Sequence, residues 1–451
     1  MRQGLGAKLG IGWRLHGDGS TPRPGESVAP DERLSWGRTV GLGAQHVVAM
    51  FGATFVFPVL MGLDPNLAIM VSGVATILFL LIVQGKIPSY LGSSASFVGV
   101  VAVIRAGGGD SSVVTGALLV CALVLSAVGL LIHFVGAQVV NRLLPPAVSG
   151  AVVMLIGFNL APVVASTYWP QDQWVALITM LLVLGCSALL RGFWSRIAVF
   201  IGLVVGYALS WLFDRVFGPI TAPDASGVVS THPRLDLSAV ADAPWFGLPT
   251  LHAPSFDLAA VVVVLPVVIA LIAENAGHVK AVEEMTGAKL DGSMGRAIFA
   301  DGFASTLSTA VGGPPTTTYA ENIGVMAATR VYSTAAYWVA AVVAVLFGLC
   351  PKFGAVIAAT PGGVLGGITV VLYGMIGLLG AKIWVENRVD FGNPVNLLPL
   401  AAGLVMGIGG VSLQITPQFS LNGIALGTLV TLVGYHLLRL LVPGQRDHSA
   451  G

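Results

Sequence analysis

Charged side chains are scarce in this 451-residue sequence: Asp, Glu, Lys and Arg make up 10% of the residues, whereas hydrophobic residues make up 55%. Soluble domains carry about 25% charged residues, so the composition excludes an ordinary soluble domain. The net charge is only +1, and the basic residues are scattered along the chain and form no patch. This distribution argues against a nucleic-acid partner.

Cysteine is also rare, which limits disulfide and metal chemistry. Cys121, Cys186 and Cys350 are odd in number, lie in apolar segments and have no metal-ligand spacing, so we interpret them as packing residues. The glycines at 362–367 are not followed by Lys-Ser or Lys-Thr, and this absence of a nucleotide-binding loop argues against ATP-driven transport. We expect no metal and no organic cofactor.

Long apolar runs dominate the chain. From about Val40 to Leu441 they recur with short polar breaks, and a helix needs roughly 20 such residues to cross a bilayer. We count about fourteen runs. The sequence therefore predicts an all-α polytopic membrane protein of about 14 transmembrane helices.

Basic residues in the connections predict the orientation. With the N-terminus inside, most Lys and Arg residues fall on the cytoplasmic side, and Arg105, Arg234 and Lys352 form the outside minority. Both termini are then cytoplasmic, and we expect a multi-pass protein of the inner (plasma) membrane. The predicted regions are a mobile cytoplasmic tail at 1–37, a first repeat at 38–217, an external loop at 218–256, a second repeat at 257–441 and a cytoplasmic tail at 442–451.

Polar interruptions of the apolar runs recur in the same order in both halves. Gln45-His46 interrupts the first span, and Glu274-Asn275 interrupts the first span of the second half. The stretch PSYLGSSASF (88–97) opens the third span, and GGPPTTTYAEN (312–322) opens the third span of the second half. The offsets of the two pairs are 228 and 224 residues. Because halves of seven spans insert in opposite senses, we predict a 7+7 inverted repeat.

The second pair of interruptions predicts two broken helices. Proline removes an amide donor and forces an extended approach, whereas small hydroxyl side chains can satisfy free backbone groups. In lipid, non-helical backbone survives only where it is buried in protein or lines a cavity. We therefore predict two short extended segments, each followed by a half-helix, that face each other at a central site. The residues assigned to these breaks are Gly92, Ser94, Pro314, Thr317 and Asn322.

Two glutamates, Glu274 and Glu321, interrupt these apolar segments. A carboxylate at membrane depth costs about 3 kcal/mol or more, so its presence indicates binding or proton transfer. An ionised glutamate only accepts hydrogen bonds, which calls for a ligand with N–H donors or for a bound proton or cation. Phe97, Tyr319 and Tyr373 would supply flat apolar walls. A neutral heterocycle with an imide edge fits these groups better than an anion.

The stretch AENIGVMAATRVYS (320–333) resembles the signature of the nucleobase-ascorbate transporter family, and it is most similar to the bacterial uracil permease branch. The signature positions are Glu321, Asn322, Gly324, Thr329 and Arg330. Further similar motifs are QH at 45–46, GSSASF at 92–97, AENAGH at 273–278 and LYG at 372–374. The resemblance covers about residues 34–441.

This resemblance implies a secondary active transporter that imports a nucleobase, uracil, by proton symport. A core of spans one to four and eight to eleven would move against a gate of the other six spans, as in an elevator, and two copies would form a homodimer through the gate. The partners are then the nucleobase, membrane lipid and a second copy, and the proton is the coupling ion.

The resemblance also assigns roles to single residues. Glu274 and Glu321 would bind the base, and Phe97, Tyr319 and Ala320 would line the pocket. His278 would join the proton-coupling network with Glu274, and His46 is the next candidate. One departure is Asn275, where uracil permeases often have histidine.

Other interpretations of these residues stay open. Glu274 and His278 lie four residues apart, so they could form an internal pair, or a metal site together with His46. Glu321 could cap a helix, and Gln45-His46 could bond only to neighbouring spans. Arg330 could be a simple anchor at the cytoplasmic end of a span.

Other functions also stay open. A xanthine, uric acid or broader purine and pyrimidine permease is the main alternative. An intramembrane hydrolase would need a nucleophile elbow or an HExxH motif, and the sequence has neither, so we expect no enzyme activity. A channel fits less well, because a closed site of aromatic residues and glutamates suits an occluded ligand.

Overall fold

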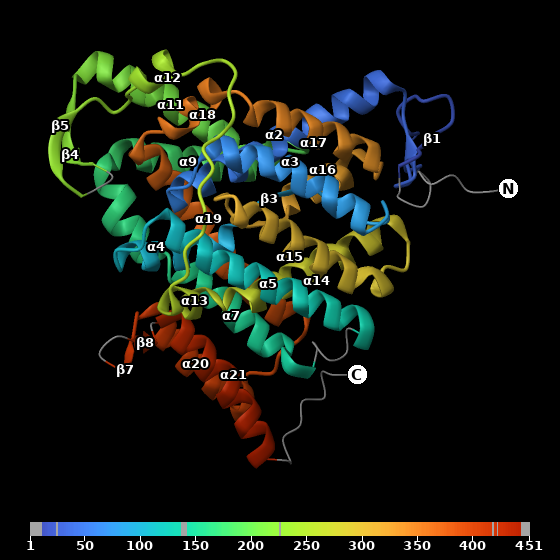
Figure 1. The fold of residues 1–451 in the computed structure, drawn as a ribbon, viewed down its shortest axis with the longest axis vertical. Coiled ribbons are helices and arrows are strands. Elements are labelled where there is room, and N and C mark those ends of the chain that lie inside the picture. Colours follow the sequence, from blue (N-terminus) through green and yellow to red (C-terminus); the bar gives the residue numbers. More distant parts are fainter. Residues whose placement is uncertain are drawn as a thin grey trace.

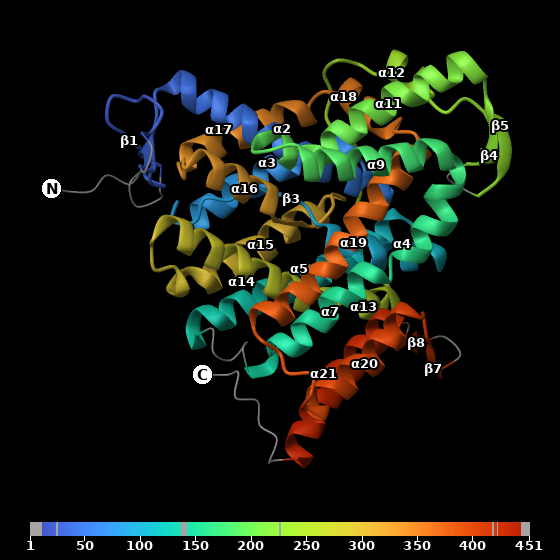
Figure 2. The same cartoon turned by 180° about the vertical axis from the view of Figure 1, so that it is seen from behind.

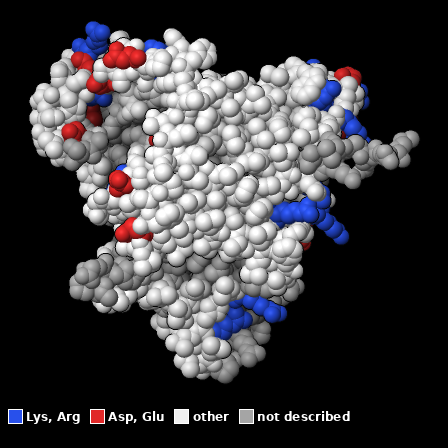
Figure 3. Space-filling view, viewed as in Figure 1, with Lys and Arg blue, Asp and Glu red and all other residues white. Residues whose placement is uncertain are grey.

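The computed structural model describes residues 11–23, 26–136, 142–224, 227–416, 419–421 and 423–442, and these are mainly helical (Figure 1). Within them, eight helices are long and apolar enough to cross a membrane, or nine if the pair Thr334–Gly348 and Pro351–Ala358, bent by 84°, is one broken span. Figure 3 shows a broad uncharged surface with charged side chains near its rims. The chain is therefore a mostly helical, multi-pass membrane protein. Residues 443–451 of the predicted C-terminal tail lie outside the described residues.

The helices of the first half are α2 (Trp36–Met61), α3 (Pro65–Ile82), α4 (Val98–Ala106), α5 (Ser111–Val135), α7 (Pro146–Phe158), α8 (Ala161–Val163), α9 (Gln173–Leu189), α10 (Phe193–Arg196) and α11 (Ala198–Phe217). Single helical turns are η1 (Ala95–Phe97), η2 (Val164–Tyr168) and η3 (Trp169–Gln171). The strands are β1 (Arg14–Leu15), β2 (Glu32–Arg33) and β3 (Leu91–Ser93), and the connection between the halves adds β4 (Ile220–Pro223), β5 (Val229–His232) and α12 (Ser238–Asp242).

The helices of the second half are α13 (Leu258–Val264), α14 (Val267–Thr286), α15 (Met294–Ala310), α16 (Ala320–Thr329), α17 (Thr334–Gly348), α18 (Pro351–Ala358), α19 (Gly362–Glu386), α20 (Pro394–Ile408) and α21 (Gly423–Leu441), with the turn η4 (Asp291–Ser293). Its strands are β6 (Thr316–Thr318), β7 (Leu413–Thr416) and β8 (Phe419–Leu421). The pairs β1–β2, β3–β6, β4–β5 and β7–β8 form four two-stranded sheets.

Local sequence signals set several helix ends. Asp64, Asp110 and Asp172 are the N-caps of α3, α5 and α9, and each side chain accepts hydrogen bonds from backbone N–H groups of the first turn. Helix α2 ends at Gly62, which has the left-handed conformation (φ 66) that glycine adopts without a steric penalty. These caps satisfy backbone groups where the helices end.

Close helix crossings depend on glycine. Helices α5 and α15, α3 and α17, and α7 and α19 pack against each other; Figure 2 shows α19 beside α7. Gly129 faces the backbone of Phe299 where α5 meets α15, and Gly157 faces the backbone of Gly377 where α7 meets α19. A Cβ atom at Gly129 or Gly157 would overlap the neighbouring helix, so small residues permit the approach, as is common between membrane helices.

The connection between the halves is folded. Arg234 is its main anchor: Nε donates to Asp172 Oδ2 at 2.6 Å and Nη1 donates to Asp214 Oδ1 at 3.2 Å. Further along, the backbone amides of Thr250 and Ser255 donate to Asp64 Oδ2 (3.1 Å) and to the Ser112 carbonyl (2.9 Å). These contacts anchor the connection to α3, α5, α9 and α11 of the first half.

The expectation of a mobile N-terminal tail is wrong for residues 11–23 and 26–35, which we call the N-terminal clasp. Strand β1 pairs in parallel with β2, and Val28 bridges to Val331 next to α16. Val28 and Leu34 are buried with Val331. Scattered apolar residues such as these give no periodic pattern, so a sequence rich in Gly, Pro and Arg resembles a disordered segment although it has a docking surface.

We predict that Arg234→Met lowers the stability of the folded protein. The side chains of Arg234, Asp172 and Asp214 are only 12%, 7% and 17% exposed, so removal of the guanidinium leaves two poorly solvated carboxylates unpaired, at a cost of about 3 kcal/mol or more. Thermal unfolding in detergent should show a clearly lower midpoint. Arg14→Met is the control, because the Arg14–Asp31 pair is 72% and 61% exposed and such pairs contribute little. Equal midpoints for both variants would contradict the prediction.

Candidate functional site

The two extended segments predicted from the sequence lie side by side and pair with each other. Strands β3 and β6 are antiparallel, with Leu91 opposite Thr318, Gly92 opposite Thr317 and Ser93 opposite Thr316. The ladder continues at both ends, because Ser94 N donates to the Pro315 carbonyl (3.0 Å) and Tyr319 N donates to the Tyr90 carbonyl (2.9 Å). All six strand residues are buried. Helical turn η1 with α4, and helix α16, then lead away from the crossing.

Hydroxyl side chains from two long helices support the two strands in the same way. Thr76 on α3 accepts a hydrogen bond from the amide of Leu91 (2.9 Å), the first residue of β3. Ser305 on α15 accepts one from the amide of Thr316 (2.9 Å), the first residue of β6, and donates to the Thr316 carbonyl (2.8 Å). Ser308 donates to the carbonyl of Pro314 (2.5 Å). The non-helical backbone is thus satisfied within the protein, as lipid surroundings require.

Gly92 makes room for the ring of Tyr319. A Cβ atom on Gly92 would lie 2.6 Å from Cζ and from the hydroxyl oxygen of Tyr319. That hydroxyl donates to the Ser93 carbonyl (2.8 Å) and accepts from Thr54 (3.3 Å). Tyr319 is therefore fixed over β3 and is the N-cap residue of α16.

Glu321 lines a cavity of about 160 Å³ that is formed by helices of both halves. Helix α2 contributes Ala49, Gly52 and Ala53 to this cavity, and the opposite wall comes from α9, α10, α11 and α19. Glu321 lies in the first turn of α16 and is not its N-cap, although a negative charge there is favoured by the helix dipole. Ala320 begins the same helix and is exposed. The lining residues from the opposite wall are Val183, Ser187, Ser195, Ile197, Ala198, Val199, Phe200, Val371, Leu372 and Met375.

Glu274 and His278 both reach the strand crossing, but through different partners. The Glu274 carboxylate neighbours the Ser96 hydroxyl and is close enough to Asp301 and Glu321 to interact with their charges. His278 Nδ1 lies 2.7 Å from Thr318 Oγ1. Within the described residues, Glu274 and His278 form no ion pair with each other, so their spacing alone does not make them a closed pair.

Asp301 is a third carboxylate that the sequence analysis missed. It lies on α15 and is completely buried, and Asn275 Nδ2 donates to Asp301 Oδ2 at 2.6 Å. Oδ1 faces the Thr317 hydroxyl without a well-formed hydrogen bond. A polar chain thus runs from His278 through Thr318 and Asn275 to Asp301. The signal was present in the sequence, because the stretch ADGFAS places one acid in the middle of a weakly polar helix.

His46 lies on the other side of the crossing and bonds to a neighbouring span. Asn322 Nδ2 donates to His46 Nδ1 (3.2 Å) and to the His46 carbonyl (2.9 Å). The His46 ring also lies 4.2 Å, centroid to centroid, from the ring of Tyr337. His46 and Asn322 thereby tie α2 to α16. In the described part of the chain, no group of three His, Cys, Asp or Glu residues could hold a metal ion.

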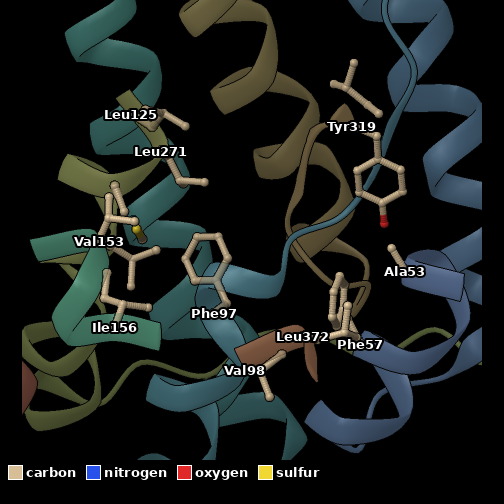
Figure 4. Close-up of a cluster of buried hydrophobic side chains, with 14 of the residues drawn as sticks. Ala53, Phe57, Phe97, Val98, Leu125, Val153, Ile156, Leu271, Tyr319 and Leu372 are labelled. Carbon is tan, nitrogen blue, oxygen red and sulfur yellow. The ribbon is translucent and has the colours of Figure 1, made fainter. Parts of the chain in front are cut away.

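The two remaining aromatic candidates lie apart from each other. Phe97 is buried among apolar side chains of α4, α5, α7 and α14 near the strand crossing (Figure 4). Tyr373 is buried on α19 and lines a different, apolar cavity of about 500 Å³ with Phe158 and Trp169. Its neighbour Leu372 lines the cavity at Glu321. The structure therefore brings Phe97, Tyr319, Glu274, Glu321 and His278 to one region and leaves Tyr373 at its edge.

The geometry is that of a membrane transport protein with a site at the break of two half-helices. The chain belongs to the xanthine/uracil permease (nucleobase-ascorbate transporter) family: the model of this permease family matches residues 37–416. It is a permease and not an enzyme.

Relatives of similar length are found in bacteria. A protein of Escherichia coli (strain K12) described as the pyrimidine permease RutG is 44% identical over 423 residues, which are 92% of each chain. The uracil permease of Bacillus caldolyticus is 38% identical over 92% of this chain and 94% of its own. The uracil permease of Escherichia coli (strain K12) is 35% identical with the same coverage.

Solved structures share the fold at low sequence identity. Murine Solute Carrier 26 family member A9, an anion transporter in the inward-facing state, has a TM-score of 0.67 and 11% identity over 92% of this chain and 70% of its own. The transmembrane domain of the cyanobacterial bicarbonate transporter BicA has a TM-score of 0.57 and 14% identity over 88% of this chain and 96% of its own. These similarities establish the architecture only.

We predict that Gly92→Ala disturbs the site while Gly185→Ala does not. The new methyl group at Gly92 would overlap the Tyr319 ring, which would have to leave its hydrogen bonds to Ser93 and Thr54, at a cost of about 1–3 kcal/mol. Gly185 lies within α9 and has open space around it, so alanine there should be neutral or slightly stabilising. Thermal unfolding of both variants checks this. A Gly92→Ala protein with the midpoint of the Gly185→Ala protein would contradict it.

Proposed function

We propose that this chain is a secondary active transporter that imports uracil by proton symport. The observation that carries the proposal is the buried crossing of β3 and β6, flanked by Glu274, Asp301 and Glu321. Within the described residues, none of these carboxylates pairs with a basic side chain. Asp301 is fully buried, and Glu274 and Glu321 are partly buried. Carboxylates without a basic partner in such surroundings need a proton or a ligand that donates hydrogen bonds.

A neutral base with both donors and acceptors matches these groups. Helix α16 has no side-chain N-cap hydrogen bond, so its first-turn N–H groups can donate to carbonyl oxygens of a ligand. Carboxylates of Glu274 and Glu321 would accept from its N–H groups. The relatives described as pyrimidine and uracil permeases support a pyrimidine, with a purine such as xanthine as the alternative.

Proton coupling is attributed to the polar chain from His278 to Asp301. A base N–H that reaches ionised Glu274 stabilises its charged form, and the nearby negative charges of Asp301 and Glu321 oppose a second ionised carboxylate. Binding of the base therefore shifts where the proton resides, and the coupling is reciprocal. The proton is the only coupling species in this proposal, and no cofactor takes part.

Fourteen membrane-spanning segments in a 7+7 inverted repeat would account for which helices pack against each other. Each half would contribute seven membrane-crossing segments that correspond in order. In residues 38–217 these segments are α2, α3, β3 with α4, α5, α7, α9 and α11. In residues 257–441 they are α13 with α14, α15, β6 with α16, α17, α19, α20 and α21. The packing of α5 on α15 is then equivalent to that of α17 on α3, and that of α9 on α19 to that of α20 on α7. The support of β3 by Thr76 is equivalent to that of β6 by Ser305.

The position of the cavity supports an elevator motion. The Glu321 cavity separates α2 and α16 from α9, α10, α11 and α19, so the first group belongs to a core and the second to a gate in the proposed arrangement. Both termini would be cytoplasmic, with residues 218–256 as an external loop, and two copies would associate through the gate. The cavity includes Ser187 and Ser195 next to the basic residues at 191–196, which supports a cytoplasmic opening.

Uptake of labelled uracil into vesicles with an imposed pH gradient tests the function. We expect accumulation driven by an inward proton gradient, with unlabelled uracil as an effective competitor and xanthine as a weak one. Effective competition by xanthine alone would assign a purine, and gradient-independent equilibration would exclude symport.

We predict that Glu321→Gln weakens uracil binding by about 2 kcal/mol or more, roughly thirtyfold in Kd. Glutamine retains the shape and one carbonyl acceptor, but it loses the charge-assisted bond and adds a donor that faces the N–H group of the base. Calorimetry on the purified variant measures this. Glu284→Gln, in the last turns of α14 and outside the site, is the matched control. Unchanged affinity in Glu321→Gln would remove Glu321 from the site.

We predict that His278→Leu reduces gradient-driven accumulation more than binding at equilibrium. The imidazole is bonded to Thr318 and not to the proposed position of the base, so leucine interrupts the polar chain and leaves Glu321 in place. Glu274→Gln should impair both quantities. Uptake with and without the gradient, and binding on the same variants, separate these effects. Full accumulation by His278→Leu would move the relay elsewhere, with His46 the next candidate.

A further inference from the structure

The N-terminal clasp lies beside the turn between α16 and α17 (Figures 1 and 2) and forms hydrogen bonds at both ends of this turn. Val28 N donates to the carbonyl of Arg330 (2.9 Å), and Tyr332 N donates to the carbonyl of Val28 (2.9 Å). Arg330 is the C-cap residue of α16, and carbonyl groups at a helix end need partners from outside the helix. The clasp therefore completes the end of α16 opposite to Glu321.

The same segment completes the start of α17. Ser333 is the N-cap of α17 but makes no side-chain capping bond. Instead, the carbonyl of Pro30 accepts hydrogen bonds from Thr334 N (3.1 Å) and from Thr334 Oγ1 (2.9 Å), and Trp13 Nε1 donates to Thr334 Oγ1 (2.8 Å). A residue 321 positions away in sequence thus fixes this turn.

The turn itself has a conformation that needs support. Arg330 has a φ of 54° and lies in the left-handed region, which is unfavourable for a residue other than glycine and persists where surrounding contacts impose it. The contacts that flank it are the two backbone bonds to Val28 and the burial of Val28 with Val331. From the sequence, Arg330 is interpreted as an anchor at the cytoplasmic end of a span. In the structure it is the C-cap residue of α16, and its carbonyl accepts a hydrogen bond from Val28 N.

We propose that the N-terminal clasp is a positioning element of the substrate site. Helix α16 is about 15 Å long, with the clasp at one end and Glu321 in the first turn at the other. A short, rigid helix transmits a tilt at its held end to the carboxylate, so the two backbone bonds of Val28 set where Glu321 meets the ligand. This inference rests on the proposed role of Glu321 in binding the base.

Val28→Pro tests the clasp because it removes the one N–H group that bonds Arg330. We expect the apparent Km for uracil to rise by about threefold to tenfold, with an unchanged maximal rate per folded transporter, since the variant changes the position of Glu321 and leaves the coupling chain intact. Val28→Ala is the matched comparison: it loses part of the buried side chain but retains the N–H group that donates to Arg330, so its Km should rise much less than that of Val28→Pro.

Amide hydrogen exchange provides a readout that does not depend on the substrate. Val28→Pro should speed up exchange in residues 320–332, and Val28→Ala should do so much less. If Val28→Pro alters only the yield of folded protein, or alters exchange without changing Km, the clasp does not position the site and the proposal is overturned. If the unmodified chain does not transport uracil, the proposed function fails, while the exchange comparison still decides whether the clasp holds α16.

Discussion

The hydrogen-bonded crossing of β3 and β6 is the constraint on which the rest of the structure depends. Two stretches of backbone leave the helical conformation inside an apolar protein, and each free amide or carbonyl there would cost several kcal/mol. The strands satisfy part of this requirement with each other, and Thr76 and Ser305 satisfy the strand ends. Glycine at position 92 and the fixed ring of Tyr319 follow from the same crossing.

Once the crossing is fixed, it determines where charge can lie. Half-helices that start at the crossing direct their first-turn N–H groups towards it, and the polar residues of α14 and α15 reach it from the side. Asn275, Thr318 and His278 then link Asp301 to the region of Glu274. A hydrolase would need a nucleophile in reaction geometry, whereas this arrangement offers hydrogen-bond acceptors and titratable groups around an open space.

Sequence patterns predicted the membrane class, the two extended segments and the region of Glu274 and Glu321, because these depend on local composition and on residues that lipid tolerates poorly. Asp301 was missed because it belongs to no recognised motif and gains its importance from Asn275, 26 positions earlier. The N-terminal clasp was misjudged for the same reason. Its partners at Arg330, Tyr332 and Thr334 lie about 300 positions away in the sequence. The single parallel bridge between Val28 and Val331 leaves no periodic pattern that would predict it.

In the proposed repeat, backbone symmetry is combined with asymmetric charge. Ser305 corresponds to Thr76, so Asp301, one turn before Ser305, corresponds to Ser72, one turn before Thr76. The alignment of β3 with β6 pairs Glu321 with Ser96, and the 228-residue offset of the first interruptions pairs Glu274 with His46. All three acids therefore belong to the second half, and their counterparts in the first half are uncharged or histidine.

In the contacts between the halves, the second half likewise supplies the acid and the first half an uncharged residue or histidine. Glu274 neighbours Ser96 across the crossing, and His46 accepts a hydrogen bond from Asn322, which is next to Glu321. A symmetric backbone allows two equivalent openings, one to each side of the membrane. In the proposed symport, the protonatable acids would all lie in one half, so the same carboxylates would serve both openings. Such a division would account for halves that have equivalent strands and hydroxyl supports but different side chains at the proposed site.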